Sequence, residues 1–162
     1  MIGRVLQILE KNGRLDDTIV TSDHGEEFND SNLNYWGHNG NFSDAQIKIP
    51  LVISWPGMPA QQISHRTTAF DVGATLLKKV LEVQTPVEDF SVGQDLFEPK
   101  GRDVFFVGSY NEDAIVAGDK VLLIKMSGVL EGHSLKDWEE IDVAPLKRRV
   151  LAYLQMRGKY RQ

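Results

Sequence analysis

An Asp-His pair stands where a short apolar segment ends, and these two residues have the clearest chemical potential in the sequence. Asp23 and His24 follow residues 18–22, whose mostly β-branched side chains predict a short buried strand. A carboxylate oxygen and an imidazole nitrogen can bind one ion together, a donor pair suited to Zn or Mn and, with more oxygen ligands, to Mg or Ca. Gly25 would let the backbone turn sharply behind them. Alone, the pair fits an ordinary exposed turn better, because a metal site normally needs three or four protein ligands.

A long polar segment contains the pair and continues beyond it. Residues 23–44 are rich in Asn, Gly and acidic residues, with aromatic side chains among them. A loop of about 20 residues inside a compact domain is more often functional than idle, although a mobile surface excursion is an equally simple interpretation. The segment carries His38, which by itself would be an exposed loop histidine. Glu26 and Glu27 would either orient His24 or be solvated charges, and solvated charges are the simpler interpretation.

The N-terminal elements must position these residues. Residues 2–12 place apolar side chains at helical spacing, and Gly13 supplies a C-terminal stop. Residues 49–55 predict a second buried strand after the polar segment. A helix that leads into a buried strand is an α/β pattern, which predicts parallel strands whose functional groups gather at their C-terminal ends. A second helix is predicted over residues 71–81, with Asp71 as its N-cap.

The C-terminal part of the sequence predicts three short strands separated by tight turns, which is typical of an antiparallel meander. The predicted strands are residues 104–107, 114–117 and 121–126, and the turns are residues 111–113 and 118–120. A last helix is predicted over residues 145–157, with Pro145 in its first turn. We therefore divide the chain into residues 1–100, an α/β core portion, and residues 101–162, a meander with a terminal helix, within one structural domain.

Length, charge and composition limit the classes of function. With 162 residues, the chain can form one domain with a real core. Its 18 basic and 23 acidic residues give a net charge of −5, which argues against a nucleic-acid partner. The absence of cysteine excludes disulfides, zinc–thiolate sites and a Cys nucleophile. Basic residues of the predicted last helix could meet an anionic membrane surface, although a solvated helix face is the commoner explanation.

Three motifs in the first third of the chain resemble the sulfatase-like branch of the alkaline phosphatase superfamily. They are SDHGE at residues 22–26, the HN pair at 38–39, and a lysine followed by the strand IPLV at 48–52. The branch also includes phosphoethanolamine and phosphoglycerol transferases that modify lipids. The Asn-rich and aromatic loop resembles in particular that of inner-membrane sulfatase-like proteins.

Two later motifs extend the resemblance to about residues 1–126. The sequence TTAFDVGATLL at 67–77 is similar to the family's helix after the sheet, with Gly73 and Ala74 where a proline is usual. SVGQDL at 91–96 is similar to the family's G-x-S/D-L turn. The resemblance implies an α/β fold, namely the C-terminal part of an alkaline-phosphatase-like sandwich with a small antiparallel sheet and a C-terminal helix.

The resemblance also implies roles for individual residues. Asp23 and His24 match two metal ligands of the family, so the implied cofactor is a divalent ion: Mn, Zn, Mg or Ca. His38 matches the loop histidine that contacts the phosphate or sulfate of the substrate, where it would neutralise anionic oxygens as charge develops on them. The implied partner is therefore an anionic phosphate or sulfate ester, or a lipid headgroup.

The family's nucleophile is a Thr, Ser or formylglycine that precedes the SDHG segment, together with the early acidic ligands. Residues 1–17 predict only a helix and a turn, so we expect a C-terminal fragment that is inactive by itself and pairs with the N-terminal half of the same protein. The whole protein would be a metal-dependent hydrolase, a lipid headgroup transferase, or a non-catalytic sensor of lipid or lipopolysaccharide. The resemblance implies an inner-membrane protein with this part in the periplasm.

Overall fold

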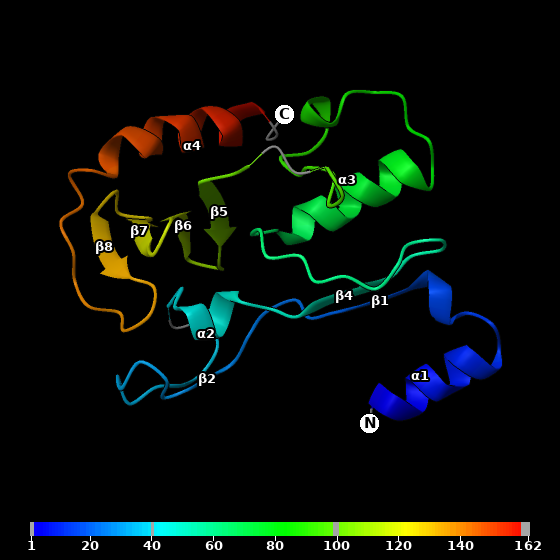
Figure 1. The fold of residues 1–162 in the computed structure, drawn as a ribbon. Helices are drawn as coiled ribbons and strands as arrows, with labels where there is room; N and C mark the ends of the chain where they lie inside the picture. The colour runs from blue at the N-terminus through cyan, green and yellow to red at the C-terminus, as the bar shows by residue number, and fades with distance from the viewer. Residues whose placement is uncertain (1, 40, 99–100, 160–162) are drawn as a thin grey trace.

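The computed structural model describes residues 2–39, 41–98 and 101–159, and shows a mixed α/β architecture with small antiparallel sheets and a C-terminal helix (Figure 1). This is the predicted fold class. The helices are α1 (Ile2–Lys11), α2 (Asp44–Ile47), α3 (Ala69–Lys79) and α4 (Lys147–Lys159), with short 3₁₀ turns η1 (Leu15–Asp17) and η2 (Val87–Asp89). The strands are β1 (Thr18–Thr21), β2 (Glu27–Phe28), β3 (Trp36–Gly37), β4 (Leu51–Ser54), β5 (Val104–Gly108), β6 (Glu112–Ala117), β7 (Lys120–Lys125) and β8 (Leu130–Ser134).

The C-terminal half is built on a four-stranded antiparallel meander in the order β5-β6-β7-β8. The three predicted strands are present, but Glu112 and Asp113, which were expected in a turn, begin β6 and pair with β7. The fourth strand, β8, was not predicted. Its sequence LEGHS has no β-branched or aromatic residue, so only its pairing with the apolar β7 makes it a strand.

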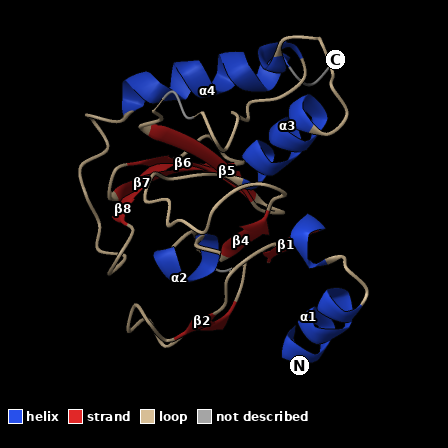
Figure 2. Ribbon diagram, turned by 45° about the vertical axis from the view of Figure 1, so that its right-hand side comes forward, coloured by secondary structure: helices blue, strands red, loops and turns tan. Residues whose placement is uncertain are grey.

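Both faces of this sheet are covered. On one face, Leu146 and Tyr153 of the C-terminal segment pack against Ile115 and Leu122, so α4 lies across the sheet (Figure 2). On the other face, Phe42 from the long polar segment packs against the strands together with Leu135 and the partly buried Ile47 and Trp138. The same sheet therefore forms the main core and provides an anchor for the segment that carries the candidate site.

The strands β1 and β4 form a separate two-stranded sheet, and their pairing corrects the sequence-based prediction. They run antiparallel, with Thr21 opposite Leu51 and Thr18 opposite Ser54, whereas parallel strands were expected. The chain leaves β1, makes its long excursion and returns beside the point of departure, so the two strands are the arms of one wide hairpin. Neither strand contains a fully buried residue, although both were predicted to be buried.

Helix α3 begins two residues earlier than predicted, and Asp71 is not its N-cap. Thr68 is the N-cap, and Asp71 occupies the third helical position, where its carboxylate accepts the Thr68 N–H at 2.7 Å in a capping box. The same buried carboxylate accepts the backbone N–H of Gln94 and forms an ion pair with Arg102, both at 2.7 Å. Asp71 thus holds the turn at residues 91–96 and the start of the C-terminal half against α3.

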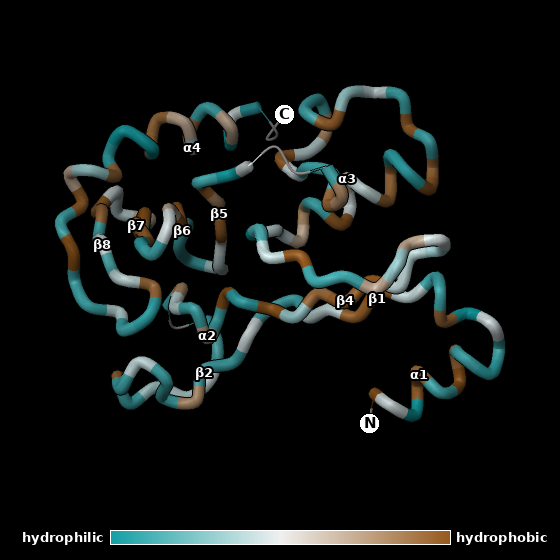
Figure 3. Tube along the Cα trace, in the orientation of Figure 1, coloured by the Kyte–Doolittle hydropathy of each residue, from teal (hydrophilic) through white to brown (hydrophobic). Residues whose placement is uncertain are grey.

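Helix α1 has the predicted extent to within one residue but contains no buried residue. Its apolar side chains Ile2, Val5 and Ile8 are each more than half exposed. Figure 3 shows α1, with apolar segments along it, standing apart from the four-stranded sheet. Among the described residues, no helix has both the length and the apolar character that crossing a membrane would require.

Candidate metal and anion site

The Asp-His pair lies directly beyond the last residue of β1, on an exposed turn. The Asp23 carboxylate accepts the backbone N–H of His24 at 3.1 Å, and the Ser22 hydroxyl donates to the carbonyl oxygen of His24 at 2.7 Å. The backbone amide of Asp23 and the adjacent His24 imidazole lower the pKa of Asp23 from its ordinary value. Asp23 is therefore ionised at neutral pH, and its side chain is 89% exposed and accessible to a ligand.

Gly25 is required here by a close approach, which corrects the sharp-turn explanation. Its backbone conformation is not left-handed. A Cβ at this position would lie 2.1 Å from the carbonyl oxygen of Ala45, and the Gly25 N–H donates to the Gln46 carbonyl at 2.8 Å. The residue after His24 is therefore packed directly against the backbone of α2, and any side chain would push the two segments apart.

Glu27 was interpreted as a solvated charge, and that interpretation is wrong. Its side chain is fully buried, at 0% exposure. One carboxylate oxygen accepts three hydrogen bonds, from Asn41 Nδ2 at 2.9 Å, Ser43 Oγ at 3.0 Å and Gln46 Nε2 at 2.9 Å. Burial by itself raises the pKa of Glu27, but these donors and Ser31 outweigh it and hold the pKa below the ordinary value. Glu27 thus ties both ends of the long loop together, and no feature of the sequence pattern indicated this role.

The long loop is an ordered structure with specific anchors. Strands β2 and β3 form a short hairpin, and the Asp44 N–H donates to the Leu135 carbonyl at 3.0 Å beside the buried Phe42. Its asparagines have a conformational role, because Asn tolerates the left-handed region better than other non-glycine residues. Four of them have φ between 55° and 71°, namely Asn29, Asn32, Asn34 and Asn39.

This folding brings His38 beside His24. The centroids of the two imidazole rings are 4.0 Å apart, although the residues are separated by fourteen positions in the chain. His38 Nδ1 lies 2.9 Å from a carboxylate oxygen of Glu26, and the Tyr35 hydroxyl donates to the His38 carbonyl at 2.7 Å. Glu26 is thus paired with His38, so it is more than the solvated charge that was expected. Of the three predicted site residues, His24 and His38 are thus in ring contact, and Asp23 adjoins His24.

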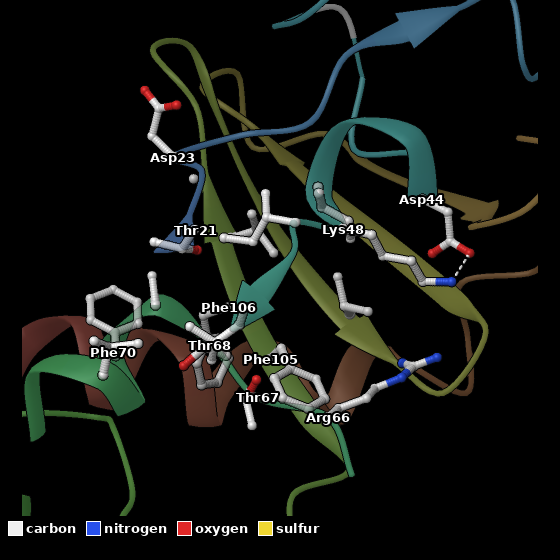
Figure 4. A pocket seen from close by; sticks show the side chains of 18 of the residues that line it. Thr21, Asp23, Asp44, Lys48, Arg66, Thr67, Thr68, Phe70, Phe105 and Phe106 are labelled. Carbon is white, nitrogen blue, oxygen red and sulfur yellow. Dashed lines mark hydrogen bonds and ion pairs between the residues drawn. The ribbon is translucent and has the colours of Figure 1, made fainter. Parts of the chain in front are cut away.

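A cavity of about 490 Å³ opens beside the end of β1. Figure 4 shows Phe70, Phe105 and Phe106 along its lining, with Lys48 and Arg66 extending on the side away from Phe70. Lys48 is ion-paired with Asp44, and Arg66 donates to the carbonyl of Gly118. Thr21 and Asp23 line the cavity as well, so Asp23 joins this space to the exposed cluster around His24.

The donor atoms of the Asp-His pair fit a divalent ion. Asp23 Oδ1 and His24 Nε2 lie 3.8 Å apart, a separation close to that of two ligands on one metal ion. His24 Nδ1 is 2.7 Å from the Gly25 carbonyl oxygen, so Nδ1 carries the proton and Nε2 is free to bind. The pair supplies two ligands, one hard oxygen and one nitrogen.

Comparison with known proteins identifies the family of this chain. The sulfatase family matches residues 1–80, which span α1, β1 and β4, the polar segment of residues 23–44 (the site loop) and α3. The inner membrane protein YejM of Salmonella typhimurium is 32% identical over 142 residues, which is 84% of this chain. The chain belongs to the sulfatase family. Rat steryl-sulfatase is 31% identical over 109 residues, covering 59% of the chain and 19% of that protein.

The fold agrees with membership of the sulfatase family. The crystal structure of a phosphonate monoester hydrolase of Agrobacterium radiobacter superposes with a TM-score of 0.66 over 98% of this chain and 38% of that one. The identity in that comparison is 24%, so it supports the fold alone. The chain spans about a quarter of the length of YejM, since the match covers 24% of it.

Proposed function

We propose that this chain is the C-terminal segment of a sulfatase-type, metal-dependent hydrolase of phosphate or sulfate esters. The proximity of Asp23, His24 and His38 carries the proposal, because the family motifs that assign these residues to one site also lie together in space. Asp23 and His24 would hold a divalent ion, which would supply Lewis-acid polarisation of the ester. Its identity stays open among Mn, Zn, Mg and Ca.

In this proposal His38 binds the anionic part of the substrate. Glu26 accepts a hydrogen bond from His38 Nδ1, and Tyr35 fixes the backbone behind it, so in the imidazolium form of His38 the N–H at Nε2 can donate to an anionic oxygen. A hydrogen-bond donor that is already oriented stabilises charge as it develops, at little cost in reorganisation. The attacking nucleophile and the remaining ligands would come from the rest of a protein about as long as YejM, of which this chain corresponds to about a quarter. The segment by itself would be inactive.

We also propose a cellular location for the whole protein. YejM is described as an inner membrane protein, and the whole protein here would likewise be held at the inner membrane with this segment in the periplasm. An anionic ester or a lipid headgroup would then be the substrate within reach. Whether the acceptor is water or a lipid hydroxyl separates a hydrolase from a transferase.

The test uses a chimera in which this chain replaces the matching quarter of Salmonella YejM. We expect calorimetry to detect tight binding of Mn²⁺ or Zn²⁺, and p-nitrophenyl phosphate or sulfate to be turned over. Asp23→Asn should abolish both, while Asp16→Asn, at an exposed position before β1, should leave both unchanged. A folded chimera that binds no metal, or that binds metal without dependence on Asp23, would overturn the proposal and favour a non-catalytic lipid-sensing scaffold.

A further inference from the structure

Three side chains of the site loop form a group that the sulfatase-type roles do not combine. His24, Glu26 and His38 each place one metal-binding atom within 4.8 Å of the others. Within residues 2–39, 41–98 and 101–159, no other trio of His, Asp or Glu does so. Asp23, the expected ligand, is not a member of this group. We propose that the chain by itself binds one divalent transition-metal ion, such as Zn²⁺, through His24, Glu26 and His38.

The composition of the group favours a transition metal. Two imidazole nitrogens and one carboxylate oxygen are the ligands of a His₂Glu zinc site, and such sites leave a fourth position open for water or an anionic oxygen. Imidazole suits Zn, Cu and Ni, whereas Mg and Ca prefer sites made of oxygen alone. The site should therefore discriminate among the divalent ions that the Asp-His pair alone accepts.

The distances require only a small closure. Ligands at about 2.1 Å from a tetrahedral zinc ion lie about 3.4 Å from one another. The atoms of the group are at most 4.8 Å apart, so a movement on the order of 1 Å brings them to that spacing. All three side chains are between 42% and 43% exposed, and nothing buried has to be displaced.

The backbone around the group restricts how far the imidazoles can drift. The close packing of Gly25 on Ala45 fixes the chain after His24, and the hydrogen bond of His24 Nδ1 to the Gly25 carbonyl leaves Nε2 as the binding atom. The Tyr35 hydroxyl holds the His38 carbonyl at 2.7 Å. The imidazoles are therefore held near each other before any ion arrives, which lowers the entropy cost of binding.

His24 is a metal ligand in both the proposed function and this inference, whereas His38 has a different role in each, and the inference does not rest on the proposed function. In the proposed function Asp23 is a ligand and His38 contacts the substrate. In the site proposed here, His38 and Glu26 are ligands, and Asp23 lies outside the coordination sphere. The two assignments therefore predict opposite effects for substitutions at Asp23 and Glu26, and one set of variants separates them.

The test is calorimetric titration of the 162-residue chain with ZnCl₂ and with MgCl₂. We expect one Zn²⁺ per chain, bound at least tenfold more tightly than Mg²⁺. Glu26→Gln and His38→Ala should each weaken Zn²⁺ binding by about tenfold or more. The matched controls Glu10→Gln and His65→Ala, at exposed positions outside the group, should bind like the parent chain, and Asp23→Asn should change the affinity less than about threefold.

A second measurement does not depend on the folding of any variant. During Zn²⁺ titration, the imidazole ¹⁵N signals of His24 and His38 should shift together and those of His65 and His133 should stay in place. Binding that is lost in Asp23→Asn but kept in Glu26→Gln would overturn this inference and leave the proposed function standing. Absence of Zn²⁺ binding by the folded chain would also overturn it, while the chimera would still decide the proposed function.

Discussion

The sheet β5–β8 and the hairpin β1–β4 are stabilised in different ways. In the sheet, Ile115, Val121 and Leu122 are at 0% exposure and both faces are covered. In β1 and β4 no residue is fully buried, and the neighbouring α1 buries nothing. The segment with the candidate chemistry therefore has almost no core of its own, and its position depends on contacts with the sheet and on polar contacts within its loop.

The two kinds of anchor can be named. Phe42 inserts into the core of the sheet, and Asp44 adds a backbone hydrogen bond to Leu135. Inside the loop, the buried Glu27 accepts hydrogen bonds from Asn41 and Gln46, which lie 14 and 19 positions away from it in the sequence. Apolar burial in the sheet β5–β8 therefore determines whether this chain folds, whereas the polar contacts of Glu27 determine whether the site residues are correctly placed.

The largest effect should come from the sheet core. Ile115→Ala removes a fully buried side chain and leaves a cavity, so the free energy of unfolding should fall by about 3 kcal/mol. Ile8→Ala makes the same chemical change on α1, where the side chain is 61% exposed, and should change stability by less than about 0.5 kcal/mol. Urea-induced unfolding followed by circular dichroism measures both. Equal losses in the two variants would show that α1 is covered in solution and would remove the contrast between the regions.

Sequence patterns predicted the elements well where local periodicity decides structure. Helices α1, α3 and α4 and strands β5 to β7 follow from apolar spacing, with ends displaced by one or two residues. The direction of the β1–β4 pairing did not follow, because it depends on where the loop of residues 22–50 returns and not on the residues in either strand. Strand β8 was missed for a related reason, since its partner β7 and not its own composition makes it a strand.

The candidate site was predicted in part. The motifs predicted Asp23, His24 and His38 as site residues, which stays a prediction, and the loop brings the two histidines into ring contact. The buried role of Glu27 was missed because a carboxylate that is buried and saturated with hydrogen bonds has the same letter as a solvated one. Only the fold shows that Asn41, Ser43 and Gln46 converge on one oxygen atom. The close contact of Gly25 with Ala45 is likewise a tertiary feature.

An intermediate effect is expected at Glu27. Glu27→Ala leaves the buried donors of Ser43 and Gln46 and the partly buried donor of Asn41 without their acceptor, and should lower the free energy of unfolding by about 2 kcal/mol at pH 7. The pKa of Glu27 lies below its ordinary value of 4.5 in the folded protein, so its contribution is complete above that pH and is lost as the pH falls through the folded pKa. The stability difference between parent and variant should therefore shrink in acid, as urea titrations from pH 7 to pH 3 would measure.

The matched control for Glu27 is Glu10→Ala on the exposed face of α1, which should be nearly neutral at every pH. Glu27→Ala should also shift the imidazole signals of His24 and His38, because the loop that carries them loses its buried anchor. A variant that loses stability but leaves these signals unmoved would contradict the idea that Glu27 places the site.

The smallest effect should come from the polar contact that holds α4 on the sheet. The contribution of this contact should be lost in alkali, whereas that of Glu27 is lost in acid. The Tyr153 hydroxyl donates to Asp113, which also accepts from Arg157 at 2.8 Å. Burial, and then Asp113, raise the pKa of Tyr153 to about 12 from 10.0. Tyr153→Phe should cost about 1 kcal/mol at pH 7, with Tyr110→Phe, at 98% exposure, as the neutral control.

Because the pKa of Tyr153 is higher in the folded than in the unfolded chain, its contribution is complete below about pH 10 and falls as the pH rises toward 12. The parent chain should therefore lose more stability than Tyr153→Phe over that interval, which urea titrations at pH 9 to 12 would detect. Parallel losses in the two proteins would show that Tyr153 ionises freely and that α4 separates from the sheet in alkali. With the expected result, acid would weaken the anchor of the site loop and alkali the cover of the sheet, so pH would distinguish the two regions without any substitution.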